Sequence, residues 1–128
     1  MLQWALQSVW YTTIYKFLFG WLVNMVDWLI DSYISSKNFK EALVFLEQNK
    51  TSENKLAYQK VTFYRGLELY TDGDYKGAYS LFKKSITENK DAKFTARATF
   101  WKAETEYNLD QFEEAKLSFK QFLNSTEA

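Results

Sequence analysis

Apolar residues recur every third or fourth position after Asp74, which is the spacing of one face of an α-helix. The preceding residues, Asp72-Gly73-Asp74, have the composition of a turn, and the Asp74 carboxylate can accept a hydrogen bond from a free backbone N–H at a helix start. The pattern therefore predicts a helix that begins near residue 75. Its apolar face comprises Tyr75, Ala78, Tyr79, Phe82 and Ile86.

The same apolar face occurs twice more in the chain, at intervals of 36 and 37 residues. In each copy an aromatic residue is followed three positions later by alanine, and a short polar turn comes before it. A fixed interval of this length is typical of proteins that are built from stacked structural repeats. The first copy contains Phe39, Ala42, Leu43 and Leu46, and the third contains Phe112, Ala115, Lys116 and Phe119.

A second helical pattern precedes the later two copies, and its residues also align. Gly66 and Ala103 each lie twelve residues before the alanine of the following helix. Such small residues let two antiparallel helices approach closely, while the aromatic residues fill the space around the contact. Because one helix pair cannot bury both of its faces, the pairs are expected to stack. The other aligned pairs are Phe63 with Phe100, Tyr64 with Trp101, Tyr70 with Tyr107, and Lys60 with Arg97.

These positions resemble the tetratricopeptide repeat (TPR) family, which has a small residue and a late aromatic residue in helix A, then Tyr/Phe-x-x-Ala-x-x-x-Phe in helix B. The best copy contains Gly66, Tyr70, Gly73-Asp74-Tyr75, Ala78 and Phe82, and the third contains Ala103, Tyr107, Phe112, Ala115 and Phe119. The first copy departs most from this pattern, because Ile30 stands where the family has a small residue. The interval is slightly longer than the family's, and the proline that often closes a repeat is absent.

The resemblance covers roughly residues 22–125. Within this range the sequence is loosely similar to multi-repeat proteins of bacterial cell envelopes. It implies an all-α fold, a right-handed solenoid of about three antiparallel helix pairs, in a bacterial cytoplasm or periplasm. We expect one domain, in which an apolar helix at 1–20, the B helix of an incomplete repeat, precedes repeats at 21–50, 55–89 and 92–125. The last helix is expected to end near Leu123 without a polar capping helix, as in a piece of a longer array.

The first thirty residues differ in composition from the rest of the chain. They contain four of the five tryptophans, and only Lys16 and Asp27 carry charge. The connection between helices at 16–23, KFLFGWLV, is apolar where the equivalent later connections are polar. A turn there would leave a large apolar surface in water. The candidate self-association residues are Trp4, Trp10, Phe17, Phe19, Trp21 and Trp28.

Four explanations of this segment remain open. The surface is buried against a second copy of the chain, it is covered by a segment missing from this sequence, it contacts a membrane, or it has been deliberately redesigned. Burial against protein is favoured over membrane contact. A membrane-spanning helix is disfavoured because every window of about twenty residues includes a charge at Lys16 or Asp27. A secretory signal is also disfavoured, because no basic residue precedes the apolar run.

The composition limits the ligands and the catalytic chemistry that the chain can support. The net charge is zero, with sixteen residues of each sign, so nothing favours nucleic acid. Lys83-Lys84 and Arg97 lie among acidic residues and are interpreted as solvated surface. The chain has neither cysteine nor histidine, and its neighbouring carboxylates diverge on helices or suit turns. The sequence therefore predicts a non-enzyme without cofactor or metal.

Helix A of each repeat lines the inner wall of such a solenoid, so matching positions should form one strip. A mixture of Lys, Arg, Tyr and Trp suits an extended peptide or a partner helix, although the aromatic residues also suit packing between helices. Leu67 and Glu104 stand where some family members have a carboxylate-clamping asparagine, which disfavours that ligand. The predicted function is a protein-binding scaffold, and the alternative is a self-assembling homo-oligomer, natural, excised or engineered. The predicted strip is Asp31, Lys60, Tyr64, Arg97, Trp101, Glu104 and Asn108.

Overall fold

The computed structural model describes residues 12–21, 25, 29, 32 and 35–127. The chain divides into two compact units, Met1–Ser36 and Lys37–Ala128. In the first unit, residues 12–21 are helical. Within the described part of the chain there is no strand, so the prediction of an all-α protein is confirmed. No described helix is both long enough and apolar enough to cross a bilayer.

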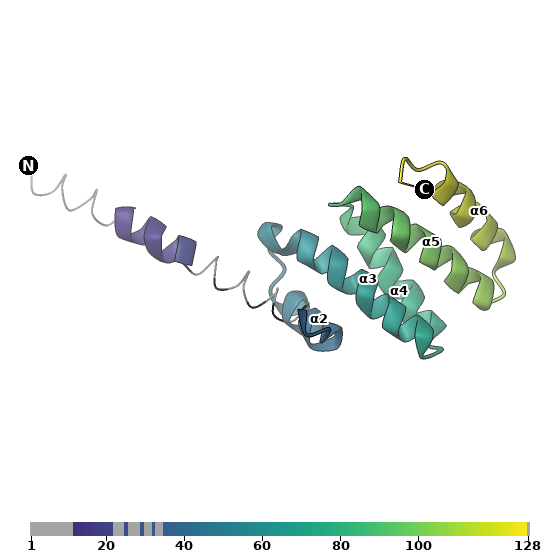
Figure 1. Ribbon diagram of the computed structural model, residues 1–128, viewed down its shortest axis with the longest axis horizontal. Helices are drawn as coiled ribbons and strands as arrows, with labels where there is room; N and C mark the ends of the chain where they lie inside the picture. Colours follow the sequence, from purple (N-terminus) through teal and green to yellow (C-terminus); the bar gives the residue numbers. More distant parts are fainter. Residues whose placement is uncertain (1–11, 22–24, 26–28, 30–31, 33–34, 128) are drawn as a thin grey trace, which may run out of the picture. The chain divides into compact units, whose positions relative to one another are not determined.

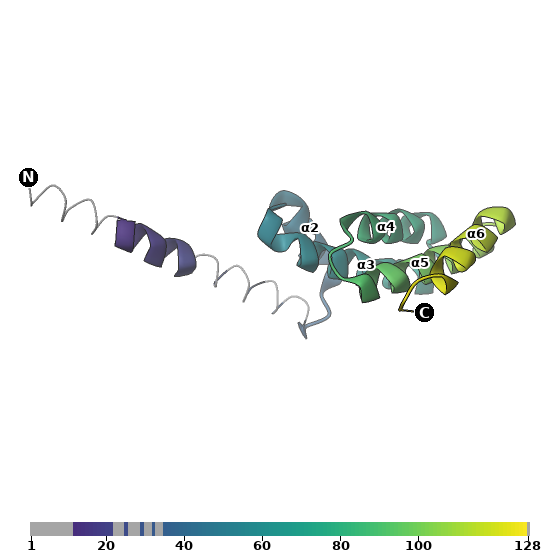
Figure 2. The ribbon, with the colours of Figure 1, turned by 90° about the horizontal axis from the view of Figure 1, so that it is seen from above.

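The second unit consists of helices that pack on one another in sequence order (Figure 1). Helix α3 also contacts α5, and Figure 2 shows these two helices in one layer with α2 and α4 in the other. The three-residue turn 72–74 lets α4 return along α3, and 109–111 joins α5 to α6 in the same way. The elements are α2 (Phe39–Gln48), the 3-10 helix η1 (Ser52–Asn54), α3 (Lys55–Thr71), α4 (Tyr75–Glu88), α5 (Ala92–Asn108) and α6 (Phe112–Leu123).

Side-chain caps explain where two of the helices begin. Asp74 accepts a hydrogen bond from the Gly77 backbone N–H at 3.0 Å, which confirms its predicted role before α4. Asp91 accepts one from the Lys93 N–H at 2.8 Å at the start of α5. Each carboxylate satisfies a backbone donor that has no partner inside its helix.

The turns that precede α2, α4 and α6 share one backbone feature. Lys37, Gly73 and Asp110 have φ of 57°, 84° and 61°, so each is left-handed and lies two residues before the next helix. In the later two turns the N–H groups of Asp74 and Gln111 donate to the carbonyls of Leu69 and Glu106, both at 2.9 Å. This hydrogen bond is the longer one of a Schellman motif, in which the left-handed position favours glycine.

We therefore expect opposite effects of two substitutions in these turns. Gly73→Ala lowers the free energy of unfolding by about 1 kcal/mol, since a left-handed alanine is strained. An added Cβ at Gly73 would meet no atom within 4 Å, so this cost is one of backbone conformation alone. Asp110→Gly relieves the same strain and raises the free energy of unfolding by up to about 1 kcal/mol. Urea denaturation followed by circular dichroism measures both, and changes of the same sign would contradict the prediction.

The three repeated alanines are buried on helices, as predicted. Ala42, Ala78 and Ala115 are 1%, 0% and 2% exposed. The predicted close approach at Gly66 is also confirmed, because a Cβ there would lie 2.7 Å from the Phe82 ring. Phe82 is fully buried beside this glycine and belongs to the core cluster of the second unit.

A buried glutamine ties α3 to the connection between α4 and α5. The Gln59 Oε1 atom accepts hydrogen bonds from the backbone N–H groups of Lys90 and Asp91 at 3.0 and 2.8 Å. Its Nε2 atom donates to Thr95 Oγ1 at 2.9 Å, and the Gln59 backbone carbonyl accepts from Ser85 Oγ at 2.9 Å. One side chain thus fixes the start of α5 relative to α3, and no feature of the repeated pattern indicated it.

Candidate functional site

The described residues of the predicted strip lie on α3 and α5, and their two cations meet at one aromatic ring. The Lys60 Nζ atom is 5.8 Å from the centroid of the Phe94 ring, and the Arg97 guanidinium carbon is 5.5 Å from the same centroid. These distances suit cation–π contacts. Arg97 is exposed and Lys60 is half-buried, so both charges remain accessible to a partner.

The two aromatic residues of the strip pack against other rings. Tyr64 stacks on Phe39 with ring centroids 5.0 Å apart, and it also lies 5.8 Å from Phe94. Trp101 lies edge-on to Tyr70, with centroids 5.2 Å apart. Both side chains are half-buried and border the core cluster. Tyr64 and Trp101 therefore pack between helices and expose only part of their surface to a partner.

The end of the strip near the α3–α4 turn is polar. The Asn108 amide donates to the Tyr70 hydroxyl at 3.0 Å and to the Glu104 carbonyl at 2.8 Å, which links α5 to α3. Burial raises the pKa of the Tyr70 phenol, the Glu104 carboxylate raises it further, and the Asn108 hydrogen bond opposes this increase. Lys60, Tyr64 and Arg97 thus converge on Phe94, whereas Trp101 and Asn108 meet at Tyr70.

Several predicted site residues lie in the first unit. Asp31 of the strip, and Trp4, Trp10 and Trp28 of the self-association set, are outside the described residues. Phe17, Phe19 and Trp21 are described, and they are 75%, 58% and 57% exposed. They lie on the helical stretch 12–21, together with the exposed Tyr15 and Leu18.

The described residues contain no group of three or more carboxylates placed to hold a metal ion. The one carboxylate that is almost completely buried in α5, Glu106, accepts hydrogen bonds from Lys102 at 2.8 Å and from Ser118 at 2.6 Å. Lys102 also donates to Ser118 at 2.9 Å. These three side chains join α5 to α6 and satisfy one another, so the cluster stabilises the helix contact.

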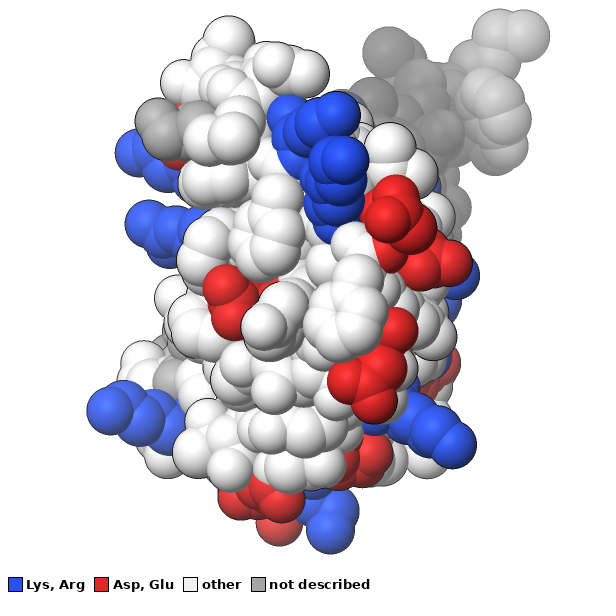
Figure 3. Space-filling view, turned by 90° about the vertical axis from the view of Figure 1, so that its right-hand side faces the viewer, with Lys and Arg blue, Asp and Glu red and all other residues white. Residues whose placement is uncertain are grey.

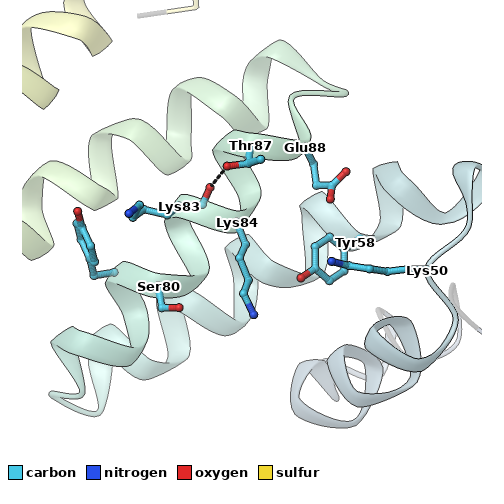
Figure 4. A pocket seen from close by; sticks show the side chains of 8 residues that line it. Lys50, Tyr58, Ser80, Lys83, Lys84, Thr87 and Glu88 are labelled. Atoms are coloured by element: carbon cyan, nitrogen blue, oxygen red, sulfur yellow. Dashed lines mark hydrogen bonds between the residues drawn. The ribbon is translucent and has the colours of Figure 1, made fainter.

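A second surface feature, a hollow of about 420 Å³, was missed by the sequence reasoning (Figure 4). We call it the lysine hollow. In Figure 4 the Lys84 side chain extends between Ser80 and Tyr58, and Lys50 lies against the Tyr58 ring. The spacing of Tyr79 and Lys83, one helical turn apart, is a local signal that could have indicated part of it. The lining residues are Lys50, Tyr58, Tyr79, Ser80, Lys83, Lys84, Thr87 and Glu88.

A buried tyrosine and an exposed carboxylate connect α2, α3 and α4 beside the lysine hollow. The Tyr58 hydroxyl donates to Glu47 Oε1 at 2.7 Å, and Lys84 Nζ lies 3.3 Å from the same oxygen. Burial raises the pKa of the Tyr58 phenol, and the hydrogen bond and charge of Glu47 raise it further. The hydrogen bond from Tyr58 is the main cause that lowers the pKa of Glu47, and Lys84 adds to the lowering.

The raised pKa of Tyr58 predicts an alkaline dependence of stability. A group whose pKa is higher in the folded state contributes stability that is present below its unfolded pKa, about 10 for tyrosine, and lost as the pH rises above it. Between pH 9 and pH 11 we expect the free energy of unfolding to fall more steeply for the unmodified chain than for Tyr58→Phe. Urea titrations at each pH measure the difference, and parallel curves would contradict the assignment.

A third surface feature is largely apolar and lies on α6 and the end of α5. An open hollow of about 410 Å³ is lined by Tyr107, Phe112, Ala115, Lys116, Phe119, Lys120 and Leu123. Tyr107, Phe112 and Leu123 are all more than half exposed. The end of the unit that carries α6 faces the viewer in Figure 3, where a broad uncharged area lies among scattered acidic and basic side chains.

Comparisons with known proteins add no family to these observations. No protein-family model matches the chain. Neither a curated protein nor a solved structure shows significant similarity to it.

Proposed function

We propose that this chain forms a right-handed solenoid of antiparallel, TPR-like helix pairs, and that it serves as a non-catalytic scaffold for a peptide or a partner helix. The recurring left-handed residues Lys37, Gly73 and Asp110, spaced 36 and 37 residues apart, support a repeated helix pair. The buried alanines at the same intervals support it as well. In this proposal α3 and α5 form the inner wall.

The observation that carries the binding function is the convergence of Lys60, Tyr64 and Arg97 on Phe94. Two helices contribute cations to one aromatic surface, and no described carboxylate lies within ion-pairing distance of either cation. Carboxylates of a partner would pair with the cations, and its apolar side chains would lie on the exposed part of the Tyr64 ring. A rigid pair of helices holds these groups in place before the partner arrives.

A selection from a random peptide library displayed on phage tests the proposal. Peptides selected by the unmodified chain should bind the Lys60→Ser/Arg97→Ser variant at least ten-fold more weakly, as measured by calorimetry with the synthetic peptides. The matched control, Lys40→Ser/Lys76→Ser, removes two exposed lysines from α2 and α4 and should leave the affinity unchanged. Equal losses in both variants, or no selected peptide, would contradict a binding surface on α3 and α5.

A second candidate function, self-assembly, is supported by the exposed rings of Phe17, Phe19 and Trp21 on one short helical stretch. Contiguous exposed apolar side chains of this size favour association with another protein surface. In this alternative the chain forms homo-oligomers through residues 1–30, and the strip on α3 and α5 is secondary.

Sedimentation velocity separates the two candidates. If self-assembly is correct, the unmodified chain sediments as an oligomer at micromolar concentration, and Phe17→Ser/Trp21→Ser shifts it to the monomer. A matched change at exposed residues of the second unit, Leu117→Ser/Leu123→Ser, should leave the oligomer intact. A monodisperse monomer at high concentration would exclude this alternative.

A further inference from the structure

Two cations of the lysine hollow lie over aromatic rings, and Lys50 also interacts at longer range with the Glu47 carboxylate. The Lys50 Nζ atom lies 4.5 Å from the Tyr58 ring centroid, and the Lys83 Nζ atom lies 5.3 Å from the Tyr79 ring centroid. Neither ammonium group has an ion-pair partner within the described part of the chain. Both lysines are exposed, and each is held over a ring face that favours positive charge.

The third lysine of the hollow is shared with an acidic residue. Lys84 lies 3.3 Å from Glu47, and both side chains are partly exposed, at 47% and 38%. Because Glu47 also accepts the Tyr58 hydrogen bond, its carboxylate is already committed within the protein. Glu88 is the one carboxylate that lines the hollow itself. Three lysines against Glu88 and the paired Glu47 leave a net charge of one positive unit toward an incoming anion.

We propose that the lysine hollow binds an acidic peptide segment, with carboxylates that pair with Lys50 and Lys83 and methylene groups that lie on the partly exposed Tyr79. The hollow is wide enough, at about 420 Å³, for two or more side chains. Its wall also supplies the Ser80 hydroxyl, which can donate to a carboxylate. The Thr87 hydrogen already donates to the Lys83 carbonyl, so the Thr87 oxygen can accept from a peptide N–H. This site is formed by different helix faces from the strip on α3 and α5, so it does not depend on the function proposed above.

The composition of the chain favours a peptide over a nucleic acid. Nucleic-acid affinity comes mainly from many simultaneous phosphate contacts along an extended basic surface. The net charge of this chain is zero, and the cations of the hollow are interrupted by Glu47 and Glu88. The partly exposed Tyr79 ring and two ammonium groups without an ion-pair partner among the described residues instead suit a few carboxylates on flexible apolar stems.

Fluorescence anisotropy with a labelled hexaglutamate peptide at low ionic strength tests the proposal. We expect saturable binding that is at least ten-fold weaker for Lys50→Gln/Lys83→Gln. Circular dichroism should show that this variant keeps its helical content and melting temperature, since both replaced side chains are exposed. A labelled hexaglutamine peptide should not bind.

One matched variant and one competing probe complete the experiment. Lys76→Gln/Lys93→Gln removes the same charge from exposed positions outside the hollow, and it should change the affinity less than two-fold. Equal weakening in this control would overturn the proposal, because the peptide would then respond to overall charge. Tighter binding of a hexathymidylate than of the peptide would overturn it in favour of a nucleic-acid site.

Discussion

Replacing Phe82 by alanine is expected to lower the free energy of unfolding by about 3–5 kcal/mol. The Phe82 side chain is 0% exposed, lies 6.1 Å from the Phe63 ring and fills the space left by the missing side chain of Gly66. Alanine would remove the apolar contacts and leave a cavity between α3 and α4 that the surrounding helices cannot fill completely. Urea denaturation monitored by circular dichroism provides the measurement.

The matched control is Leu117→Ala on the outer face of α6. Leu117 is 67% exposed, so its truncation should change the free energy of unfolding by less than about 0.5 kcal/mol. A comparable loss at both positions would show that Phe82 is not the centre of the core.

Gly66 provides a second check of the same contact. In Gly66→Ala, overpacking of about 1–3 kcal/mol against Phe82 opposes a helix-propensity gain of about 1 kcal/mol. Combining Gly66→Ala with Phe82→Leu should cost less than the sum of the two single changes, because the smaller residue makes room for the added methyl group. Strict additivity would contradict the packing of Gly66 against Phe82.

Replacing Lys102 by methionine is the second change with a large expected effect, a loss of about 3 kcal/mol. The Glu106 carboxylate is 2% exposed, and its ion pair with Lys102 at 2.8 Å compensates for its burial. Methionine retains the apolar stem and removes the charge, so the carboxylate keeps Ser118 as its remaining side-chain donor. The free energy of unfolding at pH 7, from urea denaturation, measures the loss.

Two further variants distinguish burial from charge. Lys84→Met breaks the exposed ion pair with Glu47, and it should cost less than about 1 kcal/mol. Lys102→Met/Glu106→Leu removes both buried charges and should recover most of the stability lost in Lys102→Met. If the exposed and buried pairs cost the same, the buried pair would have no special role between α5 and α6.

The sequence predicts most of the fold because its information is local and repeated. Helix starts near residues 75 and 112, the cap at Asp74 and the buried alanines all follow from helical spacing and small side chains. The solenoid arrangement and the TPR relationship stay predictions. The convergence on Phe94 could not be predicted, since the aligned residue of the preceding repeat is Ala57 and no repeated aromatic residue marks the position.

The lysine hollow and the buried polar groups could not be predicted for a different reason. Lys83-Lys84 are exposed as expected, yet their setting depends on Tyr58 from α3 and Lys50 from the loop after α2. The spacing of Lys102 and Glu106 indicates a helical pair, but their burial depends on where α6 lies. Side-chain spacing along one helix reveals pairs within it, whereas sites between helices require the tertiary packing.

The buried Gln59 has a mechanical consequence. Because its amide holds the backbone at Lys90 and Asp91 as well as Thr95, the direction in which α5 leaves the preceding connection is set by α3. The corresponding position of α5 is Ala96, whose methyl group cannot hold a backbone in this way. The angle between α3 and α5 is therefore restrained by Gln59. Replacement of Gln59 by an apolar residue would let this angle vary more, while the aromatic contacts between the helices stay intact.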